Sequence, residues 1–145
     1  MFTRIAATHA PAAVILIRFM VGAVFLSEGI QKFLFPAEVG AGRFATIGFQ
    51  SPEIVAPFVG CVEIVCGALV LLGLMTRLAA IPLIAIMLTA IATTKIPILM
   101  SEGFWKMAHE ARTDWSMLLG SIFLLVVGAG SISVDTKFST HASRS

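Results

Sequence analysis

The residues in this sequence with the greatest chemical potential are ionisable side chains inside long apolar segments. Arg18 and Glu63 lie well within two such segments, and Glu28 and Lys32 lie near the end of the first. A charge is expensive in hydrocarbon, so such residues usually face one another or a polar cavity, and they often mark paths for protons, ions or ligands. The chemistry to consider is therefore proton transfer or ligand binding by buried carboxylates and cations.

The first charged cluster is predicted near the middle of the membrane. At about 1.5 Å of rise per residue, Arg18 lies about 10 Å and Glu63 about 16 Å from the same membrane face. The difference of about 6 Å is within reach of an arginine side chain, so we expect a structural Arg18–Glu63 ion pair. The pair would either fix one helix against the other or form part of a proton or ligand site, and the sequence leaves both interpretations open.

A second cluster lies toward the opposite membrane face, where Glu28, Lys32, Lys95 and Asp114 fall within about two helical turns. Aromatic residues gather there too: Phe33, Phe35, Phe44, Phe49, Phe104, Trp105 and Trp115. One interpretation is an aromatic belt with lysines that extend to the interface. The other is a wet, aromatic-lined pocket for a ring-shaped head group, with both lysines as donors. The candidate ligand or proton site comprises Glu28, Lys32, Glu63, Lys95 and Asp114.

Other kinds of site find little support. The histidines His9, His109 and His141 fall outside the apolar segments, so no helix pair offers axial ligands to a buried haem, and we expect no metal site. Cys61 and Cys66 are five residues apart on one helix, so their side chains point about 140° apart and do not form a disulfide. No self-contained catalytic motif is present, and the sequence leaves open whether the protein is an enzyme.

The elements that position these residues follow from the composition. The chain has 145 residues, 58% of them hydrophobic and 12% charged, whereas soluble domains carry about 25% charged residues. A soluble domain of this length exposes too many residues to hide so much apolar surface. The net charge of +2 and the lack of a basic stripe argue against nucleic acid as a partner. The expected partner is the lipid bilayer.

Four apolar segments approach the ~20 residues that cross hydrocarbon: about 11–35, 52–74, 77–98 and 114–132. Backbone groups in lipid must be satisfied within their own segment, so each is expected to be a helix. The predicted fold is an all-α membrane protein, a four-transmembrane-helix up-down bundle, in one domain over 1–135 with a polar mobile tail over 136–145. Gly60 and Gly67 flank Glu63 on one face, which is typical of close helix packing.

Local signals place the ends of these helices. Phe35 and Pro36 should end the first helix, and Ser51-Pro52-Glu53 should begin the second, with the serine hydroxyl as a cap. Gly73 should end that helix. Cations are divided almost evenly between the two membrane faces, so charge bias alone does not set the orientation. If some cations belong to a polar site, both termini are cytoplasmic.

A series of stretches, in order along most of the chain, is distinctive. It comprises Arg18, "GAVFLSEGIQKFLFP" (22–36), "FATIGFQSPEIVA" (44–56), "GCVEIVCGALVLLGLMTRLAA" (60–80), "EGFW" (102–105), Asp114 before "WSMLL", and "GAGSISVD" (128–135). Together they resemble the DoxX family of small bacterial membrane proteins. The resemblance implies a multi-pass bacterial inner-membrane protein with charged family positions at Arg18, Lys32, Glu63, Arg77 and Asp114.

The resemblance also implies a function. It indicates an accessory or quinone-interacting subunit of a membrane redox or oxidative-stress system, with no intrinsic cofactor, a membrane quinone as ligand and soluble redox enzymes as partners. Many relatives carry a histidine where this chain has Lys95, so a histidine-dependent redox or metal role is not expected. The alternative is a non-enzymatic scaffold or small-solute permease whose charges are structural. Homo-oligomer formation stays open.

Overall fold

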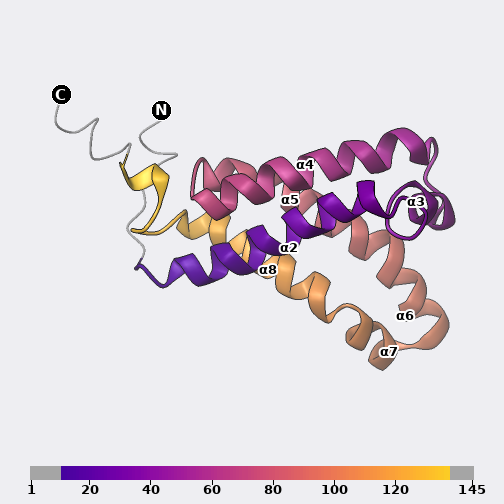
Figure 1. The fold of residues 1–145 in the computed structure, drawn as a ribbon. Coiled ribbons are helices and arrows are strands. Elements are labelled where there is room, and N and C mark those ends of the chain that lie inside the picture. The colour runs from indigo at the N-terminus through magenta and orange to yellow at the C-terminus, as the bar shows by residue number, and fades with distance from the viewer. Residues whose placement is uncertain (1–10, 138–145) are drawn as a thin grey trace.

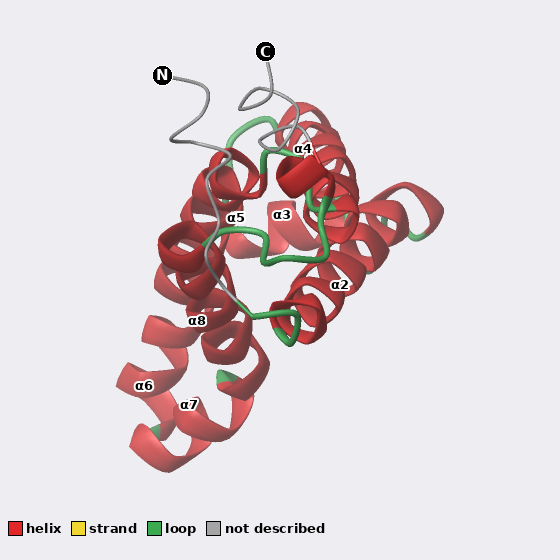
Figure 2. Cartoon of the chain, turned by 90° about the vertical axis from the view of Figure 1, so that its left-hand side faces the viewer, coloured by secondary structure: helices red, strands yellow, loops and turns green. Residues whose placement is uncertain are grey.

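The computed structural model describes residues 11–137, which form helices joined by short connections (Figures 1 and 2). In chain order the helices are α2 (Val14–Leu34), α3 (Ala41–Ile47), α4 (Pro52–Leu72), α5 (Thr76–Ala90), the π-helical turn η1 (Ile91–Lys95), α6 (Ile96–Glu102), α7 (Phe104–Glu110) and α8 (Arg112–Val127). No strand occurs in this part of the chain. The prediction of an all-α protein is confirmed.

Three helical segments are long and apolar enough to cross a membrane. They are α2, α4 and the continuous segment Thr76–Glu102, which consists of α5, η1 and α6. Helix α8 has 16 residues and is shorter than the apolar segment expected over 114–132. It stops before Gly128, whose φ of 90° leaves the helical region, so the expected extension to Ile132 was wrong.

The sequence signals for the other helix ends were mostly correct. Helix α2 ends at Leu34, and Gly73, with a φ of 68°, caps α4. Helix α4 begins at Pro52 as expected, but the Ser51 side chain makes no capping hydrogen bond, so the predicted hydroxyl cap was wrong. The short helix α3 was not predicted. Residues 134–137 form one further helical turn, and 138–145 of the expected mobile tail lie outside the described residues.

Helices α2 and α4 pack with their backbones in direct contact. A Cβ atom added to Gly22 would lie 2.8 Å from the carbonyl oxygen of Gly67, and one on Gly29 would lie 2.7 Å from that of Gly60. Each helix therefore has two glycines, seven residues apart, and each of them contacts a glycine of the other helix. Only residues without a side chain permit this approach, which confirms the packing expected from the Gly60 and Gly67 spacing.

The π-helical turn η1 follows from a proline. Pro97 has no N–H group, and its ring conflicts with the carbonyl of Thr93 four residues earlier. The chain accommodates it with a wider turn, in which the Ile96 N–H donates to the carbonyl of Ile91, five residues earlier. The helix then continues to Glu102 instead of ending near Ile98 as expected.

The helices form two closely packed pairs, α2 with α4 and α5 with α8, and the contact of α4 with α5 joins them. Figure 1 shows that α6 and α7 turn away from α2, α3 and α4 at the end of the molecule far from the termini. The candidate site lies between the two helix pairs beside α3, and neither α6 nor α7 contributes a residue to its lining.

Candidate functional site

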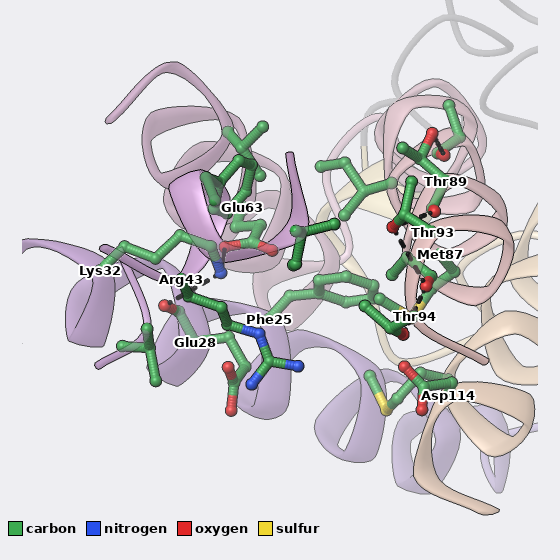
Figure 3. A pocket seen from close by; sticks show the side chains of 18 of the residues that line it. Phe25, Glu28, Lys32, Arg43, Glu63, Met87, Thr89, Thr93, Thr94 and Asp114 are labelled. Atoms are coloured by element: carbon green, nitrogen blue, oxygen red, sulfur yellow. Dashed lines mark hydrogen bonds and ion pairs between the residues drawn. The ribbon is translucent and has the colours of Figure 1, made fainter. Parts of the chain in front are cut away.

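A cavity of about 410 Å³ lies between the two helix pairs and is lined by residues of α2, α3, α4, α5, η1 and α8 (Figure 3). Its volume is within the range of about 300–1,000 Å³ that is common for small-ligand sites. The walls are largely apolar, and Phe25, Phe44, Phe49 and Met87 are among them. Such walls suit a lipophilic molecule, and the charged side chains and threonines of the lining could form hydrogen bonds with it.

The first polar feature of the cavity is an ion pair between α2 and α4. The Lys32 Nζ lies 2.7 Å from the Glu63 Oε2, and the two side chains are 9% and 4% exposed. Side chains lean toward the N-terminus of their own helix. Because α2 and α4 run antiparallel, Lys32 and Glu63 lean toward each other. The close glycine contacts between the helices bring the two charged groups within reach.

A second ion pair joins η1 to α8. The Lys95 Nζ lies 3.3 Å from the Asp114 Oδ2, with side chains 11% and 20% exposed. The wide turn of η1 carries Lys95, and Asp114 lies in the first turn of α8, where a carboxylate interacts favourably with the helix dipole. Both ion pairs therefore depend on local helix geometry.

The structure brings all five candidate residues, namely Glu28, Lys32, Glu63, Lys95 and Asp114, to the lining of this one cavity. It adds a residue that the sequence analysis missed. Arg43 of α3 lines the cavity, and its guanidinium points inward beside Glu28 and Phe25 (Figure 3). The helical spacing of Val39, Arg43 and Ile47 was the signal that would have revealed it.

Three threonines line the wall formed by α5 and η1. Their hydroxyls donate to carbonyls one turn earlier: Thr89 to Ala85 at 2.9 Å, Thr93 to Thr89 at 2.8 Å and Thr94 to Ala90 at 2.6 Å. Because each hydroxyl hydrogen is bonded to a backbone carbonyl, the hydroxyl oxygen is left as an acceptor in the cavity wall. This wall therefore offers acceptors beside the Lys95 donor.

Arg18 is not part of this cavity, and the expected Arg18–Glu63 ion pair was wrong. The Arg18 Nε donates to the carbonyl of Val70 at 2.9 Å, and its Nη1 donates to those of Ala129, at 3.2 Å, and Ile132. Its Nη2 donates to the carbonyl of Leu71. The last carbonyls of a helix have no partner within that helix, and a guanidinium has several donors to satisfy them. Glu63 pairs instead with the closer Lys32.

The aromatic residues near the second cluster divide into two groups. Phe44 and Phe49 line the cavity, whereas Phe33, Phe35, Phe104, Trp105 and Trp115 are exposed on the outer surface. Some of these rings therefore form part of the cavity wall and others face outward, and the choice between the two interpretations of the cluster stays open. Cys66 is buried and Cys61 is exposed, and both are free thiols.

Comparisons with known proteins add independent information. The family described as DoxX matches residues 13–96. The "Uncharacterized membrane protein Rv3486" of Mycobacterium tuberculosis (strain ATCC 25618 / H37Rv) is 53% identical over 145 residues, which cover 96% of this chain and 89% of the relative. The "Putative oxidoreductase CatD" of Bacillus subtilis (strain 168) is 28% identical over 121 residues, covering 83% of each chain. No solved structure matches this chain.

Proposed function

Because this chain belongs to the DoxX family and is a membrane protein, we propose that it binds a membrane quinone as an accessory subunit of a bacterial inner-membrane redox or oxidative-stress system. The observation that carries the proposal is the cavity of about 410 Å³, apolar along most of its wall and polar at two lysine–carboxylate pairs. The Bacillus subtilis relative, named as an oxidoreductase, supports a redox association.

The chemistry of a quinone fits this lining. Its ring is apolar, and its carbonyl oxygens accept hydrogen bonds from an ammonium group. Reduction builds negative charge on these oxygens, and Lys32 or Lys95 would stabilise it. Conversion to the quinol takes up two electrons and two protons. In this proposal the chain holds the head group, Glu28, Glu63 and Asp114 carry protons, and a soluble redox enzyme at the membrane supplies the electrons.

The proposal includes the arrangement in the membrane. We take α8, which packs along α5, as a fourth span beside the three long helices, which makes the chain an up-down bundle with both termini on one side. Lys32 and Lys95 are paired with carboxylates, so fewer unpaired cations remain at the cavity end. The positive-inside rule then favours cytoplasmic termini.

The direct test is extraction of the protein from native membranes into nanodiscs, followed by mass spectrometry of the bound quinones. We expect quinone with the unchanged protein and none with Lys32→Met. Lys106→Met is the matched control, because Lys106 also pairs with a carboxylate, Glu110, at 3.6 Å, but with side chains 50% and 41% exposed. This control should retain its quinone.

Loss of Lys32 leaves Glu63 without its partner, so unfolding must be measured in parallel. The double variant Lys32→Met/Glu63→Gln removes both charges, and we expect it to fold while still lacking quinone. Absence of quinone from the unchanged protein would overturn the proposal. The alternative would then be a scaffold or a small-solute permease, in which the two ion pairs only hold the helices together.

A further inference from the structure

The structure also indicates how a ligand would lie in the cavity. Building on the proposed function, we infer that the ligand is uncharged and flat, with hydrogen-bond acceptors at two opposite edges, and that it bridges the two ion pairs. Lys32 binds one edge and Lys95 binds the other.

The two ion pairs belong to separate walls. Lys32 and Glu63 join α2 to α4, whereas Lys95 and Asp114 join η1 to α8. Figure 3 shows Lys32 and Glu63 on one side of the cavity and Asp114 with the threonines on the other, with the Phe25 ring between them. A molecule in this space therefore meets one ammonium group from each wall.

Each ammonium group has donors left for a ligand. Lysine carries three N–H groups. The Lys32 Nζ contacts Glu63 at 2.7 Å and, more weakly, the carbonyl of Glu28 at 3.5 Å. The Lys95 Nζ contacts Asp114 at 3.3 Å. Both side chains are about one-tenth exposed, and an unused donor away from bulk water is unfavourable. An acceptor on each edge of a ligand would satisfy both.

The charges around the cavity cancel. Its ionisable lining consists of three cations, Lys32, Arg43 and Lys95, and three carboxylates, Glu28, Glu63 and Asp114. Glu28 and Arg43 are exposed to solvent, and the two more buried ion pairs are each balanced within themselves. An anionic ligand between these pairs would add an unpaired charge, which is costly. The balance favours an uncharged ligand over a phosphate-bearing lipid. The rings of Phe25, Phe44 and Phe49 in the wall favour a flat ligand through aromatic contacts.

The test compares two probes in nanodisc-embedded protein by isothermal titration calorimetry: para-naphthoquinone, with carbonyls at opposite edges, and alpha-tetralone, with one carbonyl. We expect Lys32→Met and Lys95→Met each to weaken para-naphthoquinone binding by about tenfold, the loss of roughly one hydrogen bond to a charged donor. Alpha-tetralone should be sensitive to only one of the two lysines. Lys106→Met should change neither affinity.

The outcomes separate this inference from the proposed function. If para-naphthoquinone does not bind the unchanged protein, quinone binding itself is refuted. If it binds but depends on one lysine, bridging is refuted while quinone binding stands. If phosphatidylglycerol competes for the cavity, the ligand is not restricted to uncharged molecules. The neutralised pairs Lys32→Met/Glu63→Gln and Lys95→Met/Asp114→Asn should bind as weakly as the single variants, which excludes a folding defect as the cause.

Discussion

At the scale of the residue, two buried cations on the same helix have different tasks. Arg18 donates to backbone carbonyls at the end of α4 and beyond α8, and it is 3% exposed. Lys32 pairs with a carboxylate and lines the cavity. The guanidinium suits the first task because it has several donors in a fixed plane, and the ammonium suits the second because it is a compact charge.

Arg18→Lys should destabilise the protein almost as much as Arg18→Met, because an ammonium cannot reach the carbonyls of both segments. We expect a loss of about 3 kcal/mol in the free energy of unfolding, the scale for hydrogen bonds to a charged donor and for carbonyls left unpaired. Titration with a denaturing detergent would measure it. Arg112→Met, at an exposed position, should stay within about 0.5 kcal/mol. Full stability of Arg18→Lys would show that charge alone matters there.

For the Lys32–Glu63 pair, we expect the double variant to lose less stability than the two single variants lose in sum. Lys32→Met alone leaves a buried carboxylate unpaired, and breaking such a pair costs about 3–5 kcal/mol. Lys32→Met/Glu63→Gln should recover most of that loss, because no unpaired charge remains. A double-mutant cycle from the same denaturant titration measures the coupling. Simple addition of the two single effects would contradict the pairing.

At the scale of the element, the glycines of α2 and α4 determine how close the two helices come. Gly67→Ala would place a Cβ 2.8 Å from the backbone nitrogen of Leu26 and 2.9 Å from the carbonyl oxygen of Gly22. Since the contacted atoms are backbone, the helices must separate, and we expect a loss of about 1–3 kcal/mol in stability. Val65→Ile adds a methyl group at an exposed position of α4 and should have no measurable effect on the same unfolding assay.

The π-helical turn gives a second prediction at this scale. Pro97→Ala restores an N–H group and removes the ring that conflicts with the Thr93 carbonyl, so the turn should relax toward α-helix. Lys95 would then rotate away from Asp114, and binding of para-naphthoquinone should weaken while helix stability rises. Calorimetry and unfolding measured on the same samples would reveal these opposite changes. Unchanged binding would show that η1 does not position Lys95.

At the scale of the whole molecule, the two ends of the bundle are built differently. The end near the termini is fixed by Arg18 and by Asp135, whose carboxylate accepts from the backbone N–H groups of Met75, at 2.8 Å, and Thr76, at 3.2 Å. Toward the other end, residues of α2, α3, α4, α5, η1 and α8 surround the cavity, and α6 and α7 turn away from α3. Hydrogen bonds from buried polar side chains therefore fix the end near the termini, whereas the polar side chains toward the other end line a cavity.

The proposed topology predicts opposite membrane sides for the C-terminus and for α7. A cytoplasmically active reporter fused after the last residue should be active, and a cysteine introduced at Lys106 should react with a membrane-impermeant thiol reagent added from outside the cytoplasmic membrane. The background should contain Cys61→Ala and Cys66→Ala, because both native thiols are free. Location of both sites on the same side would refute α8 as a fourth span.

The sequence by itself determined that this protein lies in a membrane and that its fold is helical. The chain has too few charges for a soluble surface, and its apolar segments are long enough to span a membrane. Residues such as Pro36 and Gly73 end helices. These features depend only on composition or on local sequence. They could therefore be predicted without a structure. The spacing of Gly60 and Gly67 also predicted a closely packed face on α4, because a regular period along one helix defines a face. The structure showed that α2 packs there.

Only the tertiary structure decided which charges meet. Depth along a helix matched Arg18 to Glu63, but depth contains neither the direction of a side chain nor the competing acceptors on other helices. Lys32 pairs with Glu63 because side chains on antiparallel helices lean toward each other. Arg18 instead donates to backbone carbonyls of segments more than fifty residues away in sequence. Arg43 lines the cavity because a short helix, α3, packs against α4, and a helix of this length is not stable without such packing.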